Sequence, residues 1–240
     1  MNSPALPTLP MAPPNQQNLA SEQAATMRAI RSWRVLHTCE NSAALATVLE
    51  IQVAAGMRPS LLLPEGLLER ERWAAGASCE AAGRKSLLAA WHDVRHWRRA
   101  ILDADPHHLS EIVHAHTFAS GMAAVRNCPA VVYDLTGFVE ERDGANGQPE
   151  GYSWLGRSFR VAEQFVLARA GAVIVHTRDI YAGAVKRGVA PENIFVIEPL
   201  LAPAAAVEKY DAAYRLAFSR RRAGDPHLLG SRLQPITACL

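Results

Sequence analysis

The sequence predicts an α/β domain built on a doubly wound parallel sheet. Short apolar runs of the β type alternate with segments of helical periodicity along most of the chain. The runs are continuously apolar, which is typical of strands whose two faces are both covered. Strands that alternate with helices in this way are joined by right-handed crossovers into one parallel sheet. A single layered domain with helices on both faces is therefore expected.

The predicted elements follow in a regular order. Strands are expected at 33–38, 59–65, 111–116, 130–135, 172–177 and 193–198, and helices at 41–55, 86–105, 119–126, 154–171 and 178–188. Asn41 or Ser42 can cap the first of these helices, and Gly56 can end it. The helix at 86–105 has the clearest apolar stripe, and a short edge strand is an option at 77–83.

Three parts are expected along the chain. Residues 1–32 contain repeated prolines, which disfavour helix and central strand, so we expect a disordered leader followed by a short helix. Residues 33–199 form the α/β domain. Residues 200–240 are expected to hold one helix and a basic tail, and because the alternation stops there we expect a second domain to be absent.

Composition narrows the class of protein. A formal net charge of +2 with 20% charged residues gives no reason to expect nucleic acid as a partner. The four cysteines are far apart, which signals neither a zinc site nor a disulfide framework and fits a reducing cytoplasm. No apolar run is long enough to span a membrane. Trp91 and Trp97, with basic residues nearby, leave peripheral contact with the inner face of a membrane open.

Several motifs are absent from the sequence. The first predicted strand is followed by "HTCENSAAL" and not by G-x-G-x-x-G, which disfavours an NAD enzyme. Neither a P-loop nor a G-x-S-x-G elbow occurs, which disfavours an NTPase and a serine hydrolase. We expect no cofactor.

Ligands of open parallel sheets bind beyond the carboxyl ends of the strands, near the point where the strand order reverses. This rule selects polar residues that follow the predicted strands. They are Thr38 and Asn41, His116 and Thr117, Thr136 and Gly137, Glu140 and Arg142, and His176. Glu140 and Arg142 belong to a long Gly-rich loop, which is either a binding loop or a solvated charged surface.

Two histidines share one predicted strand, and His114 and His116 lie on the same face because side chains alternate. A metal site would need a third ligand and further partners, and the neighbouring sequence supplies neither, so we expect no metal. His114 lies inside the apolar run and is expected to be a buried, hydrogen-bonded core residue. His116 lies at the strand exit, where it can contact a substrate hydroxyl or cap the loop. Asp134 is expected to lie one residue too deep.

Four segments in this order carry a family resemblance: "SEIVHAHTFASGMAA", "PAVVYDLTGFVEER", "RAGAVIVHT" and "RGVAPENIFVIEP". Together they resemble the N-terminal domain of family 4 glycosyltransferases of the GT-B fold, over Trp33 to Pro199. That family has two Rossmann-like domains that face each other across a cleft. The N-terminal one binds the acceptor, a glycan or a lipid-linked molecule, and the C-terminal one binds the nucleotide-sugar donor.

The resemblance implies metal-independent transfer of a sugar, usually with retention of anomeric configuration. It implies that His116 is catalytic and that Thr117, Thr136 and Gly137 line the acceptor side of the cleft. The chain departs from the family at "CENSAAL", where many members carry a Gly-Gly loop, and at "VIEPL", where many read "VIPN". The family's paired glutamates and basic pyrophosphate-binding residues have no counterpart.

We therefore expect an acceptor-binding half that is weak or inactive without a donor-binding domain, which a separate gene could encode. The alternative is a non-catalytic protein-interaction module derived from such a domain. Losing the second domain would bare apolar surface, and such surface favours association.

Overall fold

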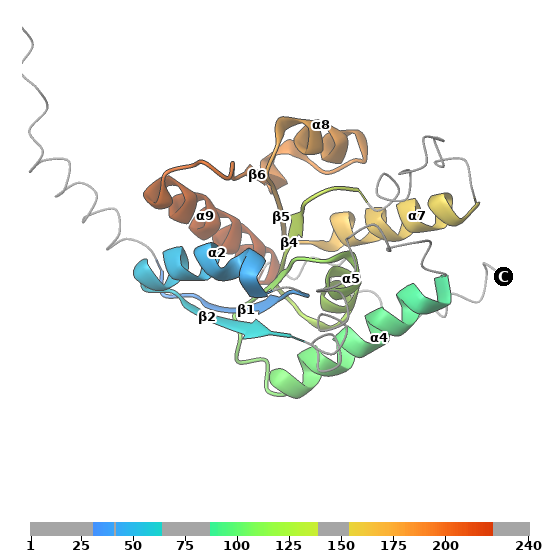
Figure 1. Ribbon diagram of the computed structural model, residues 1–240, viewed down its shortest axis with the longest axis horizontal. Coiled ribbons are helices and arrows are strands. Elements are labelled where there is room, and N and C mark those ends of the chain that lie inside the picture. Colours follow the sequence, from blue (N-terminus) through green and yellow to red (C-terminus); the bar gives the residue numbers. More distant parts are fainter. Residues whose placement is uncertain (1–30, 41, 64–86, 139–153, 223–240) are drawn as a thin grey trace, which may run out of the picture. The chain divides into compact units, whose positions relative to one another are not determined.

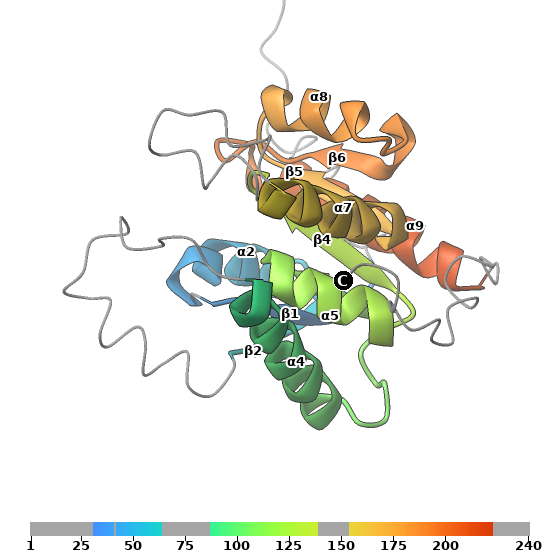
Figure 2. The same cartoon turned by 90° about the vertical axis from the view of Figure 1, so that its right-hand side faces the viewer.

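The computed structural model of the protein describes residues 31–40, 42–63, 87–138 and 154–222, which all lie in one compact unit (Figures 1 and 2). The strands are β1 (Arg34–Thr38), β2 (Arg58–Leu62), β3 (Ile112–Ala115), β4 (Val131–Leu135), β5 (Ala172–Val175) and β6 (Ile194–Val196). The helices are α2 (Ser42–Ala54), α4 (Leu87–Ala104), α5 (Phe118–Asn127), α7 (Trp154–Arg169), α8 (Arg178–Lys186) and α9 (Pro203–Arg222).

The strands form a six-stranded sheet in the order β2-β1-β3-β4-β5-β6, and every neighbouring pair is parallel. After β2 the chain returns across β1 and adds β3 on the opposite side. The strand order therefore reverses between β1 and β3, which is where doubly wound sheets place their ligands. The predicted fold class is confirmed.

Helices cover both faces of the sheet. On one face α4, α5, α7 and α8 enclose an apolar core that includes Trp97, Val113, Val166 and Ala184. On the other face α9 contacts the strands from β3 to β6 and lies beside α2 (Figure 1). Tyr214 of α9 is fully buried there.

Side chains of each strand alternate between these two faces. Leu36 and Val113 belong to the core under α4 and α5. The residues that follow them, His37 and His114, point to the other face, because the side-chain period of a strand is two. Asp134 lies on that same face, since its neighbours Tyr133 and Leu135 belong to the α4 and α5 side. The α9 face of the sheet therefore carries a line of polar side chains.

The strands β2, β3, β5 and β6 end slightly earlier than the sequence predicts, whereas β1 and β4 end at the predicted residues. β3 ends at Ala115 and β5 at Val175, so His116 and His176 are the first residues after their strands. Gly56 ends α2 with φ +79, a left-handed conformation that glycine adopts at low cost. The possible strand at 77–83 lies outside the described residues.

Two sequence expectations about α4 and the membrane can be compared with the structure. Trp97 is 1% exposed and packs on the sheet, which corrects the idea that it shares a membrane-facing surface with Trp91. None of the helices in the described ranges combines the length and apolar character needed to cross a membrane.

Candidate functional site

Histidines from β1 and β3 meet at the reversal of the strand order. The parallel register places His37 directly opposite His114, and His114 opposite Val132 of β4. Two residues further along, His116 directly follows the end of β3, and Asp134 lies near the end of β4. Parallel pairing thus brings side chains far apart in sequence to one edge of the sheet.

Asp134 joins the two histidines at the strand ends. Its Oδ2 lies 3.1 Å from Nδ1 of His116, and its Oδ1 lies 2.7 Å from Nε2 of His176. The carboxylate is only 5% exposed. Burial alone would raise the pKa of Asp134, but the hydrogen bonds from His116 and His176 hold it well below its usual range. Asp134 is therefore an anion at neutral pH.

His176 faces two hydrogen-bond acceptors. Nε2 donates to Asp134, and Nδ1 lies 2.8 Å from the carbonyl oxygen of Ile197. Because neither partner can donate, the ring satisfies both contacts only when both nitrogens carry hydrogens. The hydrogen bond to Asp134 raises the pKa of His176, and burial opposes that effect only in part. His176 is thus the cation of the site.

The polar chain continues inward from His116. Nε2 of His116 lies 3.0 Å from Nδ1 of His37, and Nε2 of His37 lies 2.9 Å from Oε1 of Gln52. Gln52 donates from Nε2 to the hydroxyl of Tyr214 over 2.8 Å, and this hydroxyl lies 3.0 Å from Nδ1 of His114. A continuous path of polar contacts therefore runs from the strand ends to α9.

The two inner histidines are neutral at physiological pH. Burial is the main cause that lowers the pKa of His37 to about 3. Burial likewise lowers the pKa of His114 well below its ordinary value. His114 is fully buried and hydrogen-bonded, which confirms the core position expected from the sequence.

Helices begin immediately after the site residues. Thr117 caps α5, and its hydroxyl forms a capping box with Ser120. Thr177 caps α8 in the same way, with its hydroxyl accepting from the backbone N–H of Ile180. These caps fix the directions of His116 and His176, because each histidine directly precedes a helix start. The hydroxyl of Thr117, expected at the acceptor, serves this cap.

The structure brings only some of the predicted residues together. His116, His176 and Thr38 gather there, and the carbonyl oxygen of Thr38 accepts from the backbone N–H of His116 at 3.1 Å. Thr136, which is exposed, and Gly137, which is half-buried, follow directly after β4. The predicted residues Asn41, Glu140 and Arg142 lie outside the described part of the chain.

Three site residues were missed from the sequence. His37 was placed inside a predicted strand and not at its end, and Asp134 was considered too deep. Gln52 faces inward from α2 and gave no signal. The common cause is strand pairing: only the β1 to β3 to β4 register shows that these side chains share one face with His114 and His116.

The fold and the site define a doubly wound α/β domain with a histidine and carboxylate cluster at its strand-order reversal. Residues 38–199 match a family model described as a glycosyl transferase 4-like domain. Because this match covers more than half of the chain, the protein belongs to the glycosyl transferase 4-like domain family. No curated protein sequence shows significant similarity to the chain.

Proposed function

We propose that this domain binds the acceptor for sugar transfer from a nucleotide-sugar donor. The observation that carries the proposal is the placement of His116, Asp134 and His176 at the reversal of the strand order, within a glycosyl transferase 4-like domain. Such a reversal is the ligand-binding edge of doubly wound sheets. A glycan or a lipid-linked saccharide is the acceptor class that the family resemblance implies.

His116 is proposed as the catalytic residue and Asp134 as the residue that positions it. In glycosyl transfer an acceptor hydroxyl attacks the anomeric carbon, the bond to the nucleoside diphosphate breaks, and the hydroxyl loses its proton. Because Nδ1 of His116 donates to Asp134, its Nε2 presents a lone pair that can accept from that hydroxyl. Nε2 faces His37 in the structure, so contact with an acceptor requires an exchange of that partner.

The donor is proposed to bind a second domain. The departing diphosphate needs positive groups or helix N-termini aimed at its oxygens. At the described strand ends His176 is cationic, but both of its ring nitrogens are already bonded. Residues of a donor-binding domain are therefore proposed to complete the phosphate site.

Saturation-transfer NMR with a panel of free glycans, lipid-linked saccharides and nucleotide sugars tests the proposal. We expect signals from at least one acceptor sugar and little from the nucleotides. His116→Ala should weaken acceptor binding roughly tenfold, since a hydrogen bond to a positioned imidazole is lost. His92→Ala, on the exposed side of α4, is the matched control and should bind as the wild type. Binding of nucleotide sugars alone, or acceptor binding unchanged by His116→Ala, would contradict the proposal.

The alternative function, that of a protein-interaction module, requires exposed apolar side chains that form one continuous surface. The large apolar side chains exposed in the described residues come from separate segments: Val53, Trp91, Leu109, Val161 and Leu200. Helix α9 covers the sheet face beside α2. Both observations favour acceptor binding, and light scattering that shows a monomer would agree with them.

A cytoplasmic location with peripheral membrane contact is also proposed, and the part that concerns membrane contact rests on α4. Trp91 is 41% exposed there, and Arg95, Arg98 and Arg99 are exposed on the same helix. Arginines beside an exposed indole suit an anionic lipid surface. Sedimentation with phosphatidylserine vesicles is the measurement that decides this point.

A further inference from the structure

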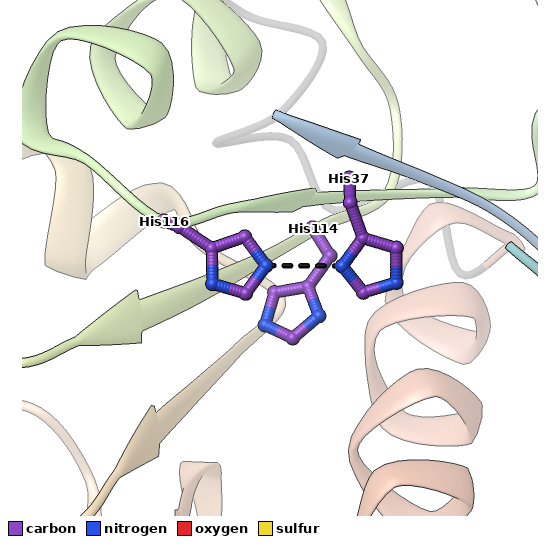
Figure 3. Close-up of side chains that lie close together, drawn as sticks. All are labelled: His37, His114 and His116. Carbon is purple, nitrogen blue, oxygen red and sulfur yellow. Dashed lines mark hydrogen bonds between the residues drawn. The ribbon is translucent and has the colours of Figure 1, made fainter. Parts of the chain in front are cut away.

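Three imidazole rings converge beneath the strand ends (Figure 3). His37 comes from β1, His114 from β3, and His116 from the residue after β3. One ring nitrogen of each lies within 4.8 Å of the other two. The ring centroids are 4.2 to 5.3 Å apart. The carboxylate of Asp134 lies beside the cluster, with Oδ2 at 3.1 Å from Nδ1 of His116 and 4.0 Å from Nε2 of His114.

The spacing is close to that of a metal centre. Zinc–nitrogen bonds of about 2.0–2.1 Å in tetrahedral geometry place the ligand atoms roughly 3.4 Å apart. Nδ1 of His37 and Nε2 of His116 are 3.0 Å apart, slightly nearer than that. The third nitrogen lies within 4.8 Å of both, so the rings must rotate to bring all three nitrogens to bonding distance from one cation.

Each imidazole already has the outer partner that metal-bound histidines have. Nδ1 of His116 bonds to the carboxylate of Asp134, and Nε2 of His37 bonds to the amide oxygen of Gln52. Nδ1 of His114 bonds to the hydroxyl of Tyr214. Such partners fix the orientation of the ring and leave the remaining nitrogen as the ligand atom.

The remaining nitrogens are poorly satisfied by the protein itself. Asp134 and the amide oxygen of Gln52 are acceptors, so the hydrogens of His116 and His37 lie on their outer nitrogens. Their inner nitrogens then present two lone pairs at 3.0 Å, which repel unless a proton or a cation lies between them. Nε2 of His114 is fully buried and has no hydrogen-bond partner among the described residues, and its nearest charged group is Oδ2 of Asp134 at 4.0 Å.

We propose that His37, His114 and His116 bind a divalent transition-metal cation of the zinc type. Imidazole nitrogens suit zinc, copper and nickel, whereas calcium and magnesium prefer oxygen ligands. Three protein ligands leave a fourth position for water or a small ligand. The proposal departs from the expectation drawn from the sequence, which lacked the third ligand. It does not depend on glycosyl transfer, since it concerns binding of the cation alone. A bound cation would occupy Nε2 of His116, so His116 can accept from an acceptor hydroxyl only in the metal-free form.

The test is a titration of the full chain with Zn²⁺ after a chelator has removed any bound metal. Titration calorimetry at pH 7.5 measures the binding. We expect saturable binding with one strong equivalent. His116→Ala should weaken that equivalent by about 100-fold or more, because removal of a ligand costs at least as much as removal of an outer partner. Co²⁺ in place of Zn²⁺ should show the visible absorption of a four-coordinate centre, and His116→Ala should lose it.

The matched control removes other histidines. His92 and His96 are four residues apart on α4, a spacing that can bind zinc on a helix surface. The double variant His92→Ala/His96→Ala should keep the strong equivalent. Loss of the strong equivalent in this variant, with retention in a folded His116→Ala, would overturn the proposal.

A measurement on the wild type covers the case in which His116→Ala does not fold. Zinc-edge X-ray absorption of the loaded protein should show at least three imidazole nitrogens at about 2.0–2.1 Å. Histidine side-chain NMR should show three buried rings that shift together with one equivalent of Zn²⁺. A first shell made of oxygen, or no saturable binding by the wild type, would refute the site.

Discussion

At the residue scale, Asp134 holds the site together. It accepts from His116 and His176, and at 5% exposure it has little access to water. A buried charge of this kind is tolerated because both of its oxygens are paired with donors. The contribution of Asp134 to stability should therefore be measurable in a variant that removes its charge and keeps both histidines.

Asp134→Asn tests that contribution. The amide keeps the shape but loses the charge, and its NH₂ group faces a histidine nitrogen that already carries a hydrogen. We expect the free energy of unfolding to fall by about 3 kcal/mol, the usual cost of breaking a buried ion pair on one side. Urea unfolding measures it. Asp103→Asn, on the exposed surface of α4, should change stability by no more than about 0.5 kcal/mol. Equal effects of the two variants would show that Asp134 has no special role.

At the element scale, the sequence predicts the strands and helices well. Every strand of the sheet and the helices α2, α4, α5, α7 and α8 correspond to segments with clear apolar patterns. The strand-end rule also finds His116 and His176 without any structure. It misses His37 because that residue lies inside β1, and a side chain within a strand reaches a site only through its neighbours in the sheet.

The packing of α9 is the element-level feature that periodicity predicts least. The sequence predicts one helix after residue 199, but it does not indicate that this helix packs against β5. Gly171, just before β5, lets α9 approach: a Cβ there would lie 2.7 Å from Cα of Ala217. Arg220 also bonds to the carbonyl oxygen of Gly171 at 3.2 Å. The close contact is between backbones, so side-chain rotation cannot relieve it.

Gly171→Ala should therefore push α9 away from the sheet. We expect a loss of about 1–3 kcal/mol of stability, as for other overpacked cores, together with faster amide hydrogen exchange in α9. Gly56→Ala is the comparison, because its φ is +79 and no atom lies within 4 Å of its added Cβ. That variant should lose about 1 kcal/mol from backbone strain and leave exchange in α9 as in the wild type. Unchanged exchange in Gly171→Ala would mean that α9 does not depend on this contact.

At the scale of the whole molecule, the site exists because strands from distant parts of the chain align. His37 and His114 are opposite each other because β1 pairs directly with β3, although β2 and α4 lie between these strands in the sequence. Their register depends on this pairing of distant strands, and the polar partners on α2 and α9 depend on helix packing. Local sequence patterns contain information neither on strand register nor on helix packing. The sequence therefore predicts that the site lies at the carboxyl ends of the strands, but it does not predict the cluster of histidines there.

The buried histidines should also make the stability of the whole fold depend on pH. The pKa of His37 falls to about 3 and that of His114 falls as well, so in both cases the unfolded chain binds the proton more readily. Their stabilising contribution is complete above the unfolded value of about 6.5 and is lost as the pH falls toward the folded value. The pKa of His176 is raised, so its contribution is complete below about 6.5 and is lost as the pH rises through its folded value.

The free energy of unfolding should therefore be highest near neutral pH and should fall on both sides. The fall should be steeper toward acid pH, because His37 and His114 both contribute there, whereas His176 alone contributes on the alkaline side. Urea unfolding from pH 4 to 9, in the presence of a chelator so that no cation holds the rings, measures the curve. His176→Gln separates the two limbs: it should flatten the alkaline decline, because the group that deprotonates there is gone, and keep the acid decline of His37 and His114. An alkaline decline that persists in His176→Gln would assign it to another group, and an acid limb that rises would mean that the inner histidines are charged in the folded protein.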